Sequence, residues 1–198
     1  MTRSSCWRAA TPSSPPRAWF GSTVSKGQTC IAVRRATVHR SLYPAFCEHL
    51  RGLAVKAEPM PLTLPAQAGK SISSWTRPSR AGAKLLVERP GADGACPPAV
   101  LIDATPEMAV CRGRRSASDG RPAVRRRGGG AWTWTGGAYA LGRRSSPAVC
   151  RRPGGWPTDR RGTVAINDVV LPTATATPFS GSGASGWGSR KAAKGCSR

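Results

Sequence analysis

The chain has 198 residues and a formal net charge of +22, from 31 basic and nine acidic side chains. Leu, Ile, Val and Phe supply only 29 residues, about 15% of the chain, which is below the roughly 20% at which highly charged chains usually fold. The composition therefore excludes a large hydrophobic core and predicts a mostly disordered or irregular chain without a globular domain.

Charge divides the sequence into three segments. Residues 1–47 form a basic segment without acidic residues, residues 48–107 are nearly balanced, and residues 108–198 form a Gly- and Arg-rich basic tail. Strong self-repulsion opposes compaction, so only the middle segment is expected to contain a small folded element.

Two short α-helices are expected in or beside the middle segment. At about 45–58, Phe46, Leu50 and Leu53 share one helical face, Pro44 is suited to the first turn, and Pro59 ends the pattern. A second, shorter helix is expected at 81–89. Apolar runs at 99–102, 108–111 and 163–171 resemble strands, but isolated hairpins are marginal in water, so no sheet is predicted.

The basic tail combines arginine clusters with tryptophans. Guanidinium groups bind phosphate bidentately and indole rings stack on unpaired bases, so the pattern favours RNA, DNA or another polyanion as partner, bound without sequence selectivity. The expected nucleic-acid-binding residues are Arg125, Arg126, Arg127, Trp132, Trp134, Arg143, Arg144, Arg151, Arg152, Trp156, Arg160 and Arg161.

Base composition offers an alternative explanation of the same arginines. Arg outnumbers Lys by 25 to 6, although both cations neutralise phosphate, and residues with GC-rich codons dominate the chain. The alternative is the product of a GC-rich open reading frame with no selected biochemical function.

Two glycine motifs resemble phosphate-binding sequences without their usual context. Gly181 to Gly186 matches GxGxxG, but the residues around it predict neither a preceding strand nor a following helix, so a flexible linker is expected. In the segment Leu64 to Ser71, leucine replaces the first glycine of a P-loop. No cofactor is predicted.

Metal-binding and catalytic residues are also not predicted. Cys30, His39, Cys47 and His49 lack the compact spacing of a structural zinc site. Cys47 and His49 are close in sequence, but side chains two positions apart on a helix diverge. We therefore expect no enzyme activity.

Targeting signals give a similarly limited result. The longest uncharged run, Val169 to Ser189, contains prolines and glycines, so no membrane span is expected, and no apolar segment typical of a secretion signal follows the first arginines. Charge favours the nucleus or nucleolus if the chain is eukaryotic, with organelle targeting by the first 47 residues as the weaker alternative. No defined protein partner is predicted.

Overall fold

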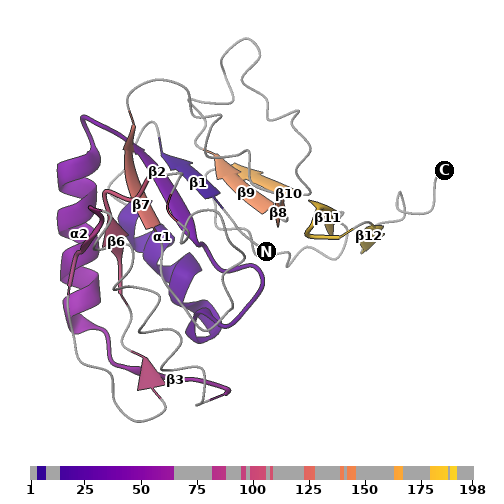
Figure 1. Cartoon of the computed structure of the whole chain (residues 1–198), viewed down its shortest axis with the longest axis horizontal. Coiled ribbons are helices and arrows are strands. Elements are labelled where there is room, and N and C mark those ends of the chain that lie inside the picture. Colours follow the sequence, from indigo (N-terminus) through magenta and orange to yellow (C-terminus); the bar gives the residue numbers. More distant parts are fainter. Residues whose placement is uncertain are drawn as a thin grey trace.

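The computed structural model describes residues 4–7, 14–64, 82–87, 95–96, 99–105, 108, 123–127, 139–140, 142–145, 163–166, 179–186 and 188–190. Figure 1 shows helices and strands packed together, with α1 and α2 beside β2. The small strands β11 and β12 lie at the right of the view.

Seven strands of the described residues form one sheet. Its order is β10-β9-β1-β2-β7-β6-β4, and every pairing is parallel except that of β4 with β6. The strands are β1 (Ser4–Trp7), β2 (Arg35–His39), β4 (Lys84–Leu85), β6 (Leu101–Ile102), β7 (Ala123–Arg127), β9 (Gly142–Ser145) and β10 (Thr163–Ile166).

Smaller sheets complete the described strands. One has the order β12-β11-β8 and the other pairs β3 with β5. Their strands are β3 (Met60–Pro61), β5 (Ala95–Cys96), β8 (Tyr139–Ala140), β11 (Phe179–Gly183) and β12 (Gly188–Arg190).

Helix α1 (Ser14–Thr23) connects the parallel neighbours β1 and β2, as a crossover between parallel strands must. Pro15 and Pro16 lie in its first turn, where the missing amide hydrogen leaves no helical bond unmade. These prolines therefore stand where the helix begins. The hydroxyls of Ser22 and Thr23 donate to the Trp19 carbonyl at its end, over 2.8 and 2.9 Å.

Helix α2 (Tyr43–Lys56) occupies the position where a helix was predicted at about 45–58. Pro44 lies in its first turn, and Tyr43, Phe46, Cys47, Leu50 and Ala54 are its buried residues. Their spacing of three and four residues puts them on one face of the helix. No helix of the described residues is long and apolar enough to span a membrane.

The prediction of a mostly disordered chain without a globular core is wrong. Phe46 and Leu50 on α2 pack against Val38 of β2 and Val100, together with Ala18 and Ala36. Alanine allows helices and strands to approach closely, so a core can form with fewer large aliphatic residues than the composition rule assumes. The fold is a globular α/β architecture instead.

The prediction of a second helix at 81–89 is also wrong over residues 82–87, which the structure describes. Lys84 and Leu85 form strand β4, which pairs antiparallel with β6, and the Leu86 amide donates to the Val100 carbonyl over 2.8 Å. Leu85 and Leu101 join a second apolar cluster with Ala83, Ala104 and Met108. Pairing with a distant segment therefore overrides the weak local helical pattern.

Candidate functional site

The connection from α1 to β2 has an unusual backbone. After α1 the chain enters the short helical turn η1 (Val24–Gly27), in which Ser25, Lys26 and Gly27 have φ values of 52°, 56° and 66°. This left-handed region is free of strain for glycine but costs other residues about 1–2 kcal/mol each. Surrounding interactions must therefore hold Ser25 and Lys26 in place.

Cys30 lies in the tight turn after η1. The Ala32 amide donates to the Thr29 carbonyl over 3.2 Å, which closes the turn, and β2 begins at Arg35. Cys30 is exposed, whereas Ala32 and Val33 after it are buried. The geometry thus presents a thiol to solvent from a backbone that is fixed on its C-terminal side.

Gln28 attaches this loop to the segment after α2. Its Nε2 donates to the Pro61 carbonyl over 3.0 Å, and its Oε1 accepts from the Thr63 amide over 2.8 Å. The Val33 amide donates to the Gly21 carbonyl over 2.7 Å and joins the other end of the loop to α1. The loop is thus bonded to two separate parts of the fold.

Arg34 holds the same loop from within. Its Nη2 donates to the Gly27 carbonyl over 2.5 Å and lies 3.5 Å from the Thr29 carbonyl. The side chain is buried, with 5% of the residue exposed. Hydrogen bonds from a charged donor in such surroundings are stronger than those on a wet surface.

Cys47 provides the contrast to Cys30. It is buried in α2, and this burial raises the pKa of its thiol to about 11, although its hydrogen-bonding contact with the Tyr43 side chain acts in the opposite direction. The Tyr43 hydroxyl itself donates to Asp103 Oδ1 over 2.8 Å and accepts from the Asp103 amide over 3.0 Å. Because the thiolate is the reactive form, Cys47 is a structural and unreactive cysteine near neutral pH.

The raised pKa of Cys47 predicts a loss of stability in alkali. Between pH 9 and pH 11 the unfolded chain loses the thiol proton while the folded chain keeps it, so the free energy of unfolding falls as pH rises. Burial and the bond to Asp103 raise the pKa of Tyr43 as well, which acts in the same direction. Urea unfolding across this range should show a steeper decline for the native chain than for Cys47→Ala. Equal declines would contradict the assignment.

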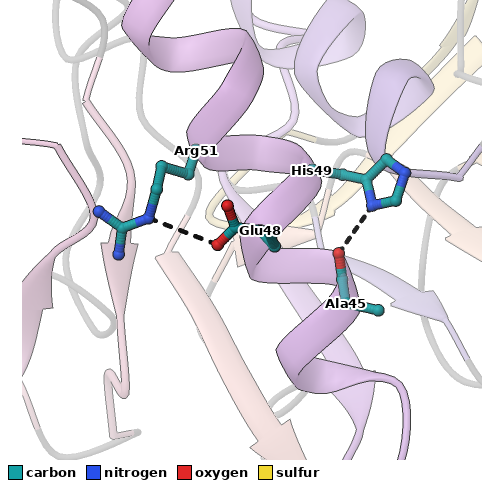
Figure 2. Close-up of polar contacts among 4 residues, drawn as sticks. All are labelled: Ala45, Glu48, His49 and Arg51. Carbon is teal, nitrogen blue, oxygen red and sulfur yellow. Dashed lines mark hydrogen bonds and ion pairs between the residues drawn. The ribbon is translucent and has the colours of Figure 1, made fainter.

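The four residues considered as metal ligands do not converge. Cys30 is exposed in the loop, His39 ends β2 with its Nδ1 2.8 Å from the Ser41 hydroxyl, and Cys47 is buried. Figure 2 shows the His49 ring at the Ala45 carbonyl, 2.9 Å away, and Glu48 paired with Arg51 over 3.7 Å. Within the described part of the chain, no three His, Cys, Asp or Glu residues gather around a common point.

The predicted nucleic-acid-binding residues are partly described. Arg125, Arg126 and Arg127 belong to β7, while Arg143 and Arg144 belong to β9. Strands β1 and β2 separate β7 from β9 in the sheet, so the two arginine clusters are not neighbours along it. The remaining predicted residues lie outside the described ranges, namely Trp132, Trp134, Arg151, Arg152, Trp156, Arg160 and Arg161.

The glycine motif at 181–186 is part of a hairpin. Strand β11 includes Gly181 and Gly183, a turn comes next, and β12 returns antiparallel to β11. Gly183 and Gly186 have φ values of 59° and 119°, as glycines in turns often do. A dinucleotide fingerprint needs a helix after the turn to receive the pyrophosphate, and here the turn leads into a strand.

Residues 14–113 match the family model of the aldehyde dehydrogenase family, and this stretch covers just over half of the chain. The chain belongs to the aldehyde dehydrogenase family. The matched stretch includes α1, the loop with Cys30, β2 and α2. No curated protein sequence matches the chain.

Solved structures of aldehyde dehydrogenases share the fold. An aldehyde dehydrogenase from Bacillus cereus, a G224D mutant, has 21% identity and a TM-score of 0.82, over 97% of this chain and 42% of its own. A salicylaldehyde dehydrogenase from Pseudomonas putida, complexed with salicylaldehyde, has 16% identity and a TM-score of 0.85, and the match covers 97% of this chain and 43% of that structure. A glyceraldehyde-3-phosphate dehydrogenase from Methanocaldococcus jannaschii, complexed with NADP, has 19% identity and a TM-score of 0.84, and the match covers 96% of this chain and 44% of that structure. The chain thus spans less than half the length of these structures.

These findings correct the functional predictions. The predicted class, a disordered, arginine-rich, nucleic-acid-binding chain that is not an enzyme, is wrong. The alternative of a reading frame without a function is also wrong, because the chain carries the domain of an enzyme family. Charge and codon usage describe composition only, whereas the family model matches residues 14–113, which include α1, β2 and α2. The sequence patterns treated Cys30 only as a possible metal ligand, and so gave no reason to consider it as a reactive thiol by itself.

Proposed function

We propose that the chain supplies the nucleophilic thiol of an enzyme that oxidises aldehydes, and that Cys30 is that thiol. The supporting observation is that the family-matched stretch places an exposed cysteine on a loop bonded to three parts of the fold. Cys47, within the same stretch, is buried and protonated. An activated cysteine must be reachable and held in a fixed geometry, and Cys30 meets both conditions.

The chemistry needs a thiol for a simple reason. An aldehyde carbon releases hydride poorly while it is trigonal. When the Cys30 thiolate adds to the carbonyl carbon, a carbon–sulfur bond forms and the π electron pair moves to oxygen, which takes a proton from water. The resulting tetrahedral carbon bears hydrogen beside an electron-rich oxygen and is prepared for oxidation.

A hydride acceptor such as a nicotinamide dinucleotide does not fit the described residues. The GxGxxG sequence is a β hairpin, and η1, which precedes Cys30, is a four-residue turn with a left-handed backbone rather than a helix that could receive a pyrophosphate. We therefore attribute to this chain the thiol chemistry alone.

Protection from alkylation tests the proposal on the full chain. Iodoacetamide labelling, followed by mass spectrometry, reports Cys30 in the tryptic peptide 27–34 and Cys47 in 41–51. We expect rapid labelling of Cys30, slowed saturably by benzaldehyde and unaffected by benzyl alcohol, which has no carbonyl group. Cys47 should label slowly, with about 0.1% thiolate at pH 8. Absence of saturable protection at Cys30 would overturn the proposal.

A further inference from the structure

We propose that Arg34 is a positioning residue, whose buried guanidinium holds the turn with Cys30 in the geometry that accepts an aldehyde. The inference builds on the proposed function, because it concerns the thiol assigned there. Arg34 is four residues after Cys30 and just before β2, so its own backbone is anchored by the sheet.

The contacts of Arg34 lead directly to the nucleophile. Its Nη2 donates to the carbonyl of Gly27 and lies near that of Thr29, the residue that precedes Cys30. One nitrogen thus connects the end of η1 with the start of the Cys30 turn. The planar guanidinium can keep such a geometry because its donors are fixed relative to one another.

The strained backbone explains why a clamp is needed here. Ser25 and Lys26 have left-handed φ values, and non-glycine residues keep this conformation only when the surrounding structure enforces it. Gln28 also holds the loop, but its bonds to Pro61 and Thr63 are exposed. The bond from Arg34 to Gly27 is buried and shielded from water, so it is the stronger of the two restraints.

Small displacements matter for the addition step. The sulfur must approach the carbonyl carbon along a defined direction, and an error of about 1 Å in such a placement can cost about 100-fold. A loose loop would leave the thiol exposed and able to meet a small alkylating reagent. It would lose the pre-organised position that an aldehyde adduct requires. Arg34 should therefore affect aldehyde affinity much more than alkylation.

The test compares Arg34→Met and Arg34→Lys with the control Arg51→Met, which changes an exposed arginine that pairs with Glu48 on the same helix. For Arg34→Met, the benzaldehyde concentration giving half protection of Cys30 should rise about 10- to 100-fold. Alkylation without aldehyde should stay within about threefold. Arg34→Lys should be intermediate, and added methylguanidine should partly restore Arg34→Met, which a general loss of structure would not allow.

Hydrogen exchange separates this inference from the proposed function. Amides of the loop peptide should exchange at least about 10-fold faster in Arg34→Met than in the native chain or Arg51→Met. If native Cys30 shows no aldehyde protection, the proposed function fails, and loop exchange still decides whether Arg34 holds the turn. If Arg34→Met does not fold, both the aldehyde affinity and the hydrogen exchange of the loop are measured on Arg34→Lys instead. Unchanged exchange or unchanged aldehyde affinity in the folded variant would overturn the role of Arg34.

Discussion

Cys30→Ser should abolish the covalent aldehyde adduct. With benzaldehyde labelled with ¹³C at the carbonyl, the native chain should give a saturable signal of a tetrahedral carbon. The variant should form the adduct at least about 100-fold more slowly, because a serine hydroxyl is a much poorer nucleophile than a thiolate at neutral pH. The change removes one sulfur at an exposed site, so the fold should be retained.

Cys47→Ala is the matched control for this experiment. It also removes one sulfur, but from the buried face of α2, and its thiol is protonated near neutral pH. The saturable tetrahedral signal should persist in this variant provided that circular dichroism shows it folded. A signal that survives in Cys30→Ser, or disappears in folded Cys47→Ala, would place the nucleophile elsewhere.

Local sequence patterns located one helix and two short strands, because the strand-like runs at 99–102 and 163–171 include β6 and β10. Phe46 and Leu50 repeat at a helical interval, Pro44 favours a helix start, and the helix α2 can be inferred from these residues alone. Helix α1 carries the same kind of signal at Pro15 and Pro16, but a proline that begins a helix and a proline that prevents one have the same local sequence pattern. The Pro-Pro pair alone therefore could not predict α1.

The sheet could not be predicted because its pairings join distant segments. Strand β2 pairs with β7, so Thr37 lies opposite Arg125 and Val38 opposite Arg126, although almost ninety residues separate them. Nothing local in an arginine run indicates a strand in a sheet. Arg34 and Arg35 are nevertheless both buried, and Nη2 of Arg34 donates to the Gly27 carbonyl. Net charge therefore did not indicate that residues 34 and 35 belong to a folded part of the chain.

The candidate site escaped prediction for a related reason. Cys30 has no local partner in sequence, and the residues that hold its loop come from positions as far apart as Gly21 and Thr63. In open α/β sheets ligands usually bind at the carboxyl ends of parallel strands, but this loop precedes β2 and so lies at its amino end. A single exposed cysteine becomes meaningful only when the fold and family are known.

Leu50→Ala should show how much the core beneath α2 contributes to the free energy of unfolding. Leu50 is 0% exposed and packs in the cluster with Phe46, Val38 and Val100, so its truncation should lower the free energy of unfolding by about 3–5 kcal/mol. That is a large fraction of the roughly 5–15 kcal/mol that stabilises a typical domain. Val55→Ala, on the same helix but 56% exposed, should change stability by less than about 0.5 kcal/mol. Urea unfolding followed by circular dichroism measures both variants. A disordered chain has no buried positions, so it would respond equally to the two substitutions and would show no cooperative transition. Equal responses, or a missing transition, would disprove the packing of α2 against the sheet.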